Sequence, residues 1–143
     1  MPGLVLLDLG AERMLKEILN NDWVAGSKNY TICLYTNNLG AIPDTATTSS
    51  FTEAVGGGYV SKTITNGSWT VGTAALRQGD YAKLTWTFTG TLTGPQTIYG
   101  YYIKDSDGVS HWAQQLDTPM TPANNGDPLS ITPAFALSKG IPV

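Results

Sequence analysis

The spacing of hydrophobic residues changes once along this chain, and that change limits the available folds more than any other feature. From Leu4 to Leu19, apolar residues recur at intervals of three and four with charged residues between them, which predicts one amphipathic helix with Asp8 at its N-cap. After Trp23 the spacing becomes two, and Gly, Asn and Asp separate the segments. This pattern is typical of β-strands joined by tight turns. The sequence therefore predicts a β domain preceded by a single helix.

The strands of the β region are expected to differ in their burial. The strand from Tyr81 to Thr89 alternates most cleanly and places Trp86 on an apolar face that must belong to the core. The segment from Gln96 to Lys104 carries apolar residues on both faces, which predicts a central strand. A last strand from Leu129 to Leu137 contains Pro133, which indicates the edge of a sheet.

Turn signals and the number of strands indicate the architecture. Asn66-Gly67 is typical of a two-residue hairpin, here joining a strand over 59–65 to one over 68–71, and Asp105 to Gly108 closes a second hairpin. Roughly eight strands with one N-terminal amphipathic helix favour an all-β fold, an antiparallel and jelly-roll-like β-sandwich. We expect a single domain, with an arm and helix over 1–22 and the sandwich over 23–143.

Charged residues are scarce in this chain. Only 13% of residues are Asp, Glu, Lys or Arg, about half the usual share, and the net charge is −3. Because nucleic-acid binding depends on a basic surface, we expect no nucleic-acid partner. The charges near the N-terminus, without a basic leader or cleavage site, argue against a signal peptide or membrane span. A surface of hydroxyls and amides loses little on desolvation, so we expect a partner to cover much of it.

The candidate catalytic residues stand alone. His111 lies on an expected strand with no nucleophile elbow in the sequence, and Cys33 lies mid-strand between apolar neighbours. Glu53 is the one Glu outside the helix, so the paired carboxyl groups of a glycosidase are missing. Asp105 to Gly108 begins like a calcium loop, but Leu116 stands where an EF-hand has its last acid. We therefore expect no enzymatic activity, metal or cofactor.

The apolar stripe of the expected helix either packs on the protein's own sheet or docks on another subunit. Together with a tryptophan on a partly polar strand face, its residues form the candidate interface: Leu4, Val5, Leu6, Leu7, Met14, Ile18 and Trp112. The tryptophans outside the expected core, Trp23, Trp69 and Trp112, could instead stack on sugar rings.

Short motifs in a fixed order extend over nearly the whole chain. They are Leu7–Glu12, Leu34–Asn38, Phe51–Ala54, Gly58-Tyr59, Tyr99–Tyr102 with Asp105 after it, Trp112-Ala113, Gly126-Asp127 and Ile131–Ser138. Their order and spacing resemble small structural proteins of tailed bacteriophages, which are encoded among virion genes.

The resemblance implies a non-enzymatic head decoration (cement) protein, or another head or tail component. Such a protein would be made in the host cytoplasm and would sit on the capsid surface, typically as a homotrimer. It would bind the major capsid protein and clamp adjoining capsomers, with no membrane partner. No catalytic position is carried over. We expect Tyr35, Phe51 and Tyr59 to tie the loop from Leu39 to Ser50 to the sandwich.

Two other functions would use the same fold. The chain could be a receptor- or carbohydrate-binding module of a tail fibre or spike, in which case its tryptophans would contact the glycan. It could also be a small tail or connector component, which would differ from a decoration protein in copy number per particle.

Overall fold

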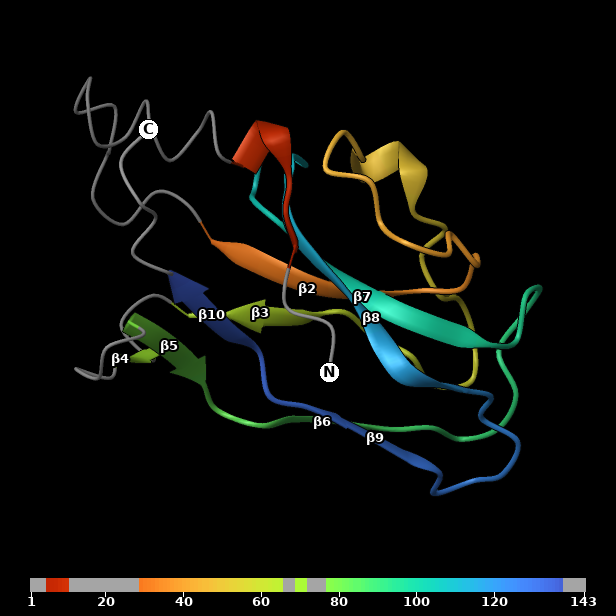
Figure 1. The fold of residues 1–143 in the computed structure, drawn as a ribbon. Coiled ribbons are helices and arrows are strands. Elements are labelled where there is room, and N and C mark those ends of the chain that lie inside the picture. Colours follow the sequence, from red (N-terminus) through yellow and green to blue (C-terminus); the bar gives the residue numbers. More distant parts are fainter. Residues whose placement is uncertain (1–4, 11–28, 66–68, 72–76, 138–143) are drawn as a thin grey trace.

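The computed structural model describes residues 5–10, 29–65, 69–71 and 77–137, which are mostly β-strand (Figure 1). The elements are β1 (Val5–Leu6), β2 (Tyr30–Tyr35), a 3-10 turn (Thr48–Ser50), β3 (Lys62–Ile64), β4 (Trp69–Val71), β5 (Arg77–Tyr81), β6 (Leu84–Thr87), β7 (Ile98–Lys104), β8 (Ser110–Met120), β9 (Pro128–Ile131) and β10 (Ala134–Leu137). All sheets are antiparallel, so the all-β prediction is confirmed at that level. The part of the chain described here contains no helix long and apolar enough to cross a membrane.

Five strands form the larger sheet, in the order β1-β8-β7-β2-β3. β7 lies between β8 and β2, and Tyr101, Tyr102 and Ile103 along it are each at most 2% exposed. The prediction of a central strand over 96–104 is therefore confirmed. The turn between β7 and β8 also forms as expected, with the amide of Asp105 donating to the carbonyl of Val109 at 2.9 Å.

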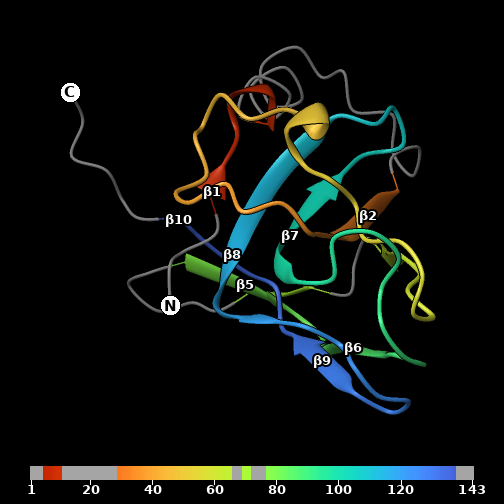
Figure 2. The ribbon, with the colours of Figure 1, turned by 90° about the vertical axis from the view of Figure 1, so that its right-hand side faces the viewer.

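The remaining strands form a second layer, which lies below β2, β7 and β8 in Figure 1, and β6 and β9 of this layer also lie lowest in Figure 2. They pair in the orders β10-β5-β4 and β6-β9. The amide of Tyr81 donates to the carbonyl of Pro133 at 2.9 Å, so β5 and β6 run beside β10 and β9 as one interrupted ribbon. The expected strands 81–89 and 129–137 are thus each divided. The break falls at Pro133, which has no N–H for the ladder.

The main core fills the space between the two layers. Its buried residues come from both: Ile32, Leu34, Ala54, Ile64, Tyr81, Trp86, Phe88, Leu92, Ile98, Tyr101, Ile103 and Ile131. Trp86 is 3% exposed, as its place on the apolar face of the predicted strand requires. Its indole N–H donates to the carbonyl of Val60 at 2.9 Å, which satisfies the polar atom of a buried ring.

A second core covers the opposite face of the five-stranded sheet. Along β2, Cys33 and Tyr35 point to this face while Ile32 and Leu34 point to the main core, because side chains alternate along a strand. The segment 39–51 lies over the second core and contributes Phe51, which is 6% exposed. The larger sheet is therefore buried on two sides.

Two predictions about local structure need correction. The strands on either side of Asn66-Gly67 do not form a hairpin, because β3 pairs with β2 and β4 pairs with β5 in the other layer. The N-terminal helix does not include Val5 and Leu6, which form β1 against β8. Residues 8–10 are helical, and the remainder of the expected helix, 11–19, lies outside the described residues.

Candidate functional site

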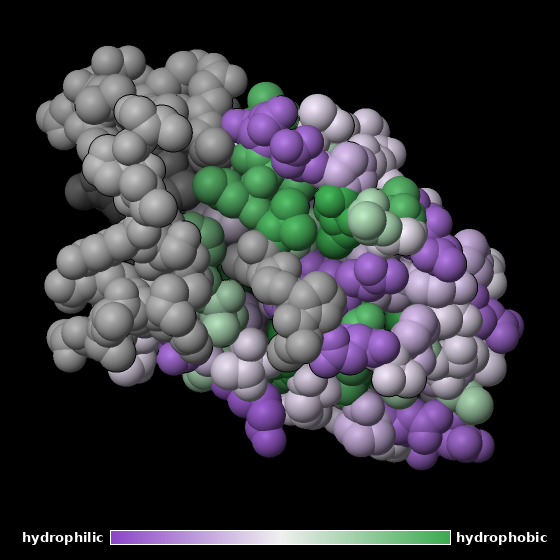
Figure 3. Space-filling view, viewed as in Figure 1, coloured by the Kyte–Doolittle hydropathy of each residue, from purple (hydrophilic) through white to green (hydrophobic). Residues whose placement is uncertain are grey.

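The outermost strand of the larger sheet, β1, is the first candidate for contact with a partner. Val5 pairs with Ala113 of β8, and Leu6 pairs with Trp112. Both β1 residues are only partly buried, and among the described strands β1 has one hydrogen-bonded neighbour, β8. Leu9, just after it, is 39% exposed. Figure 3 shows hydrophobic surface over this strand. An exposed sheet edge of this kind can accept a further strand or an apolar surface.

The residues after β1 hold this edge in place. Leu7 is fully buried and its amide donates to the carbonyl of His111 at 2.9 Å. The amide of Asp8 donates to the carbonyl of Asp44 at 3.0 Å. At Gly10, an added Cβ would lie 2.5 Å from the His111 carbonyl oxygen, so only glycine permits this close approach. Leu7 therefore belongs to the core and does not contribute surface to the candidate interface.

The other residues of the candidate interface differ in what the structure describes. Leu4, Met14 and Ile18 lie outside the described residues. Trp112 is half-buried, with its ring 5.6 Å from that of Tyr30 and 5.7 Å from that of Phe135. Its indole nitrogen is buried with no hydrogen-bond partner in the described part of the chain. The Trp112 ring therefore packs against Tyr30 and Phe135 within the protein.

His111 forms a buried pair with Asp105, which closes the turn between β7 and β8. The His111 Nε2 atom lies 2.9 Å from the Asp105 carboxylate, and the two residues are 2% and 4% exposed. The amides of Asp107 and Val109 donate to the other carboxylate oxygen at 2.9 and 3.0 Å. Burial opposes the ionisation of Asp105, but these amides and His111 outweigh it and hold its pKa below the usual value. The hydroxyl of Ser110 contacts Thr48 at 2.6 Å and is not the partner of His111.

The same contacts account for the calcium-like sequence 105–108. The Asp105 carboxylate accepts the two turn amides of Asp107 and Val109 and contacts His111, so the side chain performs the turn-forming role typical of Asp. No group of three metal-binding side chains occurs among the residues that the structure describes.

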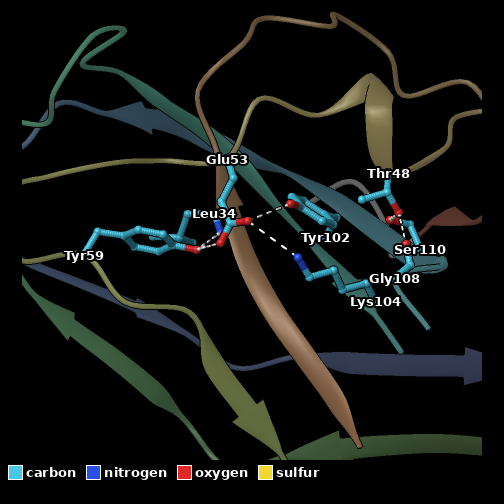
Figure 4. Close-up of polar contacts among 8 residues, drawn as sticks. All are labelled: Leu34, Thr48, Glu53, Tyr59, Tyr102, Lys104, Gly108 and Ser110. Carbon is cyan, nitrogen blue, oxygen red and sulfur yellow. Dashed lines mark hydrogen bonds and ion pairs between the residues drawn. The ribbon is translucent and has the colours of Figure 1, made fainter. Parts of the chain in front are cut away.

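Glu53 lies at the centre of a polar cluster beside the second core (Figure 4). The Tyr59 hydroxyl donates to Glu53 Oε1 at 3.0 Å, and the Tyr102 hydroxyl donates to Oε2 at 3.3 Å. Lys104 Nζ lies 3.6 Å from Oε2, with the Lys104 and Glu53 side chains 28% and 36% exposed. The Tyr59 hydroxyl also accepts the backbone N–H of Leu34 at 3.0 Å. We call these residues the Glu53 cluster.

The two tyrosine hydroxyls of this cluster and the thiol of Cys33 beside it have raised pKa values and stay protonated at neutral pH. Burial, together with the nearby Glu53 carboxylate, raises the pKa of the Cys33 thiol to about 11. Burial likewise raises the pKa of the Tyr59 and Tyr102 hydroxyls far above the ordinary value. At neutral pH the thiol is therefore protonated, whereas a nucleophilic cysteine needs its thiolate. The contacts of Glu53 join residues 53–59 to Tyr102 and Lys104 of β7.

The segment 39–52 is tied to the sheet by aromatic and polar contacts. Phe51 stacks on Tyr102 at a centroid distance of 4.7 Å and packs against Tyr35 at 5.1 Å. Thr48 contacts the Gly108 carbonyl at 2.6 Å (Figure 4). The expected role of Tyr35 and Phe51 in holding the loop is confirmed, while Tyr59 instead secures the segment that follows, through Glu53.

Sequence reasoning did not find the role of Glu53 and Lys104. One signal was present, because Glu53 is the sole charged residue between Asp44 and Lys62, and Lys104 ends a charge-free run over 84–103. A single charge inside such a run is a candidate for a specific partner.

Comparisons of this chain with models of known protein families, with curated proteins and with solved structures find no match. The assignment of function therefore depends on the sequence motifs and on the geometry above.

Proposed function

We propose that this chain is a non-enzymatic structural protein of a tailed-phage virion, most specifically a capsid decoration (cement) protein. It would bind the major capsid protein on the outer surface of the head as a homo-oligomer, with a trimer expected from the family resemblance. The observation that carries the proposal is the β1 edge, where Val5 and Leu6 stay partly exposed on a firmly held strand. The ordered motifs and the low share of charged residues support the same role.

Docking at β1 has a simple physical basis. A strand or apolar segment of a capsid subunit placed beside β1 would gain hydrogen bonds along the edge and cover the Val5 and Leu6 side chains. Each such contact adds interface area between the small protein and the shell. Because the bound form exists only on assembled capsid, binding shifts the equilibrium toward the intact shell.

We further infer that the two layers form a jelly-roll-like sandwich with a helix beginning at Asp8. The core between the layers supports this topology. In a sandwich of this kind, the N-terminal arm and helix lie at the edge of one sheet, where they are available to a neighbouring subunit.

The rival function of a glycan-binding module gains no support from the described residues. Of the tryptophans that could stack on sugar rings, Trp23 and the side chain of Trp69 lie outside the described residues, and the ring of Trp112 packs against other aromatic rings. Sugar recognition by stacking needs an accessible aromatic face. A tail or connector role stays a separate alternative, which copy number per particle would distinguish.

The test compares Leu6→Asp with Leu129→Asp in binding to purified capsids that lack this protein. Both leucines are half-buried on short strands, so both variants carry a similar cost in stability, but Leu129 lies in the second layer. We expect Leu6→Asp to lose most capsid binding and Leu129→Asp to keep it, with circular dichroism confirming that both fold. Wild-type protein that does not bind capsids would contradict the function. Equal binding by Leu6→Asp would contradict docking at β1.

A further inference from the structure

We propose that a second surface, formed by residues 55–60 and 89–93, is the contact through which copies of this chain associate. We call these two segments the glycine–threonine ribbon. Val55 and Val60 are 60% and 70% exposed, and they are two of the three exposed large hydrophobic residues in the described part of the chain. Because the backbones of the two segments are hydrogen-bonded to each other, both valines belong to one surface, which a partner can cover.

The two segments of the ribbon are locked together by their backbones. The amide of Thr93 donates to the carbonyl of Val55 at 2.7 Å, and the amide of Thr89 donates to the carbonyl of Gly57 at 2.9 Å. Gly57 has a φ of 55°, and an added Cβ would lie 2.7 Å from the carbonyl oxygen of Gly90. Glycine is required for this approach, which brings the backbones of the two segments into direct contact.

The exposed valines are therefore held on a rigid base. The carbonyl of Val60 accepts the indole N–H of buried Trp86 at 2.9 Å, and Tyr59 between the valines is fixed to Glu53 and Leu34. A surface that is already ordered loses little conformational entropy when it binds. The ribbon is thus suited to one specific contact with a partner of fixed shape.

Charge identifies the occupant as a second copy. Residues 54–61 and 84–103 contain no Asp, Glu, Lys or Arg, whereas the whole chain carries a net charge of −3. In a symmetric oligomer, residues near the symmetry axis meet their own copies, so any charge there would face a like charge. The ribbon is a surface on which copies of this acidic chain can meet without that repulsion.

The chemistry of the ribbon argues against small or charged ligands. The aromatic rings beside it, Trp86 and Phe88, are 3% and 0% exposed, so they cannot stack on a sugar. It has no cationic side chain for an anion and no carboxylate for a metal ion. What it offers are two valines and the exposed residues Thr89, Thr91 and Thr93, a combination that fits a neutral protein surface.

The ribbon and the β1 edge are separate surfaces. In Figure 1 the segments 55–60 and 89–93 lie at the right-hand end of the molecule, while β1 lies to the left of centre. One face could therefore bind the shell while the other binds the next copy. The biological meaning of the contact rests on the proposed function, but the contact itself can be measured on the isolated protein.

Sedimentation equilibrium of the full chain tests the inference with a matched pair of variants. Thr91→Glu places a charge in the ribbon. Thr132→Glu places the same charge at an exposed site outside the ribbon, because Thr132 follows Ile131, whose strand partner is Leu84 and not a ribbon residue. We expect wild-type protein and Thr132→Glu to self-associate with the same dissociation constant. Thr91→Glu and Val60→Glu should weaken association by about 30-fold or more.

Three results would overturn the inference. Wild-type protein could be monomeric at every concentration, or the ribbon variants could associate as well as wild type. In the third result, the wild-type chain alone is monomeric and the ribbon variants lose capsid binding. The ribbon would then contact the capsid shell and not a second copy. Failure of the proposed function looks different, because self-association would then persist in a protein that does not bind capsids.

Discussion

Replacing Tyr59 with Phe removes one oxygen atom and leaves the ring in place, so it isolates the polar contacts that hold the segment 53–60 on the sheet. The Tyr59 hydroxyl donates to Glu53 at 3.0 Å and accepts the backbone N–H of Leu34 at 3.0 Å. β3 pairs with β2 only as far as Ile32, so this hydroxyl extends the hydrogen bonding of β2 beyond the end of β3.

The cost of Tyr59→Phe follows from the burial of these groups. Leu34 is fully buried, and a buried amide left without an acceptor costs about 1–3 kcal/mol. The bond to the partly exposed Glu53 carboxylate adds about 1 kcal/mol. We expect the free energy of unfolding to fall by about 2–4 kcal/mol. Tyr102→Phe loses a longer bond of 3.3 Å to the same carboxylate but leaves no backbone amide without an acceptor, and it should cost about 0.5–1 kcal/mol.

Urea unfolding followed by tryptophan fluorescence measures both variants, with equal m-values showing that the unfolded states are comparable. Native-state hydrogen exchange adds a local measurement, because the amide of Leu34 should lose protection in Tyr59→Phe and keep it in Tyr102→Phe. If the two variants lost the same free energy, or if the Leu34 amide stayed equally protected in both, the assigned role of the Tyr59 hydroxyl would be refuted.

Three further predictions concern other parts of the structure. Gly100→Ala should lower the unfolding free energy by about 3 kcal/mol or more in thermal or urea unfolding, because its Cβ would lie 2.2 Å from the Gln114 carbonyl oxygen; an alanine variant as stable as wild type would contradict this packing. Asp105→Asn should cost about 1–3 kcal/mol at pH 7. Because the folded-state pKa of Asp105 is lowered, its contribution to stability is complete above the unfolded-state value of about 3.9 and is lost as the pH falls through the folded-state value. The stabilities of the two proteins should therefore converge as the pH falls below the unfolded-state value; a constant difference would refute the ionic role. Cys33, fully buried with its pKa raised to about 11, should resist iodoacetamide at pH 8 and react after unfolding in urea, as mass spectrometry would show; rapid modification of the native protein would contradict its burial.

Periodicity predicted the strands better than it predicted their partners. The buried central strand β7 and the core position of Trp86 follow from alternation within a few residues, and both were correct. The Asn66-Gly67 hairpin was wrong because pairing depends on contacts far along the chain, and β3 and β4 find their partners in different layers. Local turn preference contributes less free energy than the burial of an apolar strand face.

The candidate site was predicted in part. The loop anchors Tyr35 and Phe51 were found from their motifs, while Val5 and Leu6 were assigned to a helix and instead form a strand. Their apolar spacing fits either element over so short a stretch, and pairing with β8 decides between them. The Glu53 cluster depends on the approach of residues distant in sequence, such as Glu53 and Tyr102, which spacing along the chain does not reveal.

The central claim is that this chain assembles on a capsid shell, and its copy number in purified phage particles tests that claim most directly. Quantitative mass spectrometry of intact particles, with labelled peptides of this chain and of the major capsid protein as standards, gives the ratio of the two. The account predicts many copies in a fixed ratio to the major capsid protein, together with loss of the chain from particles carrying Leu6→Asp. A handful of copies per particle would place the protein in the tail or connector, and its absence from purified particles would contradict the account.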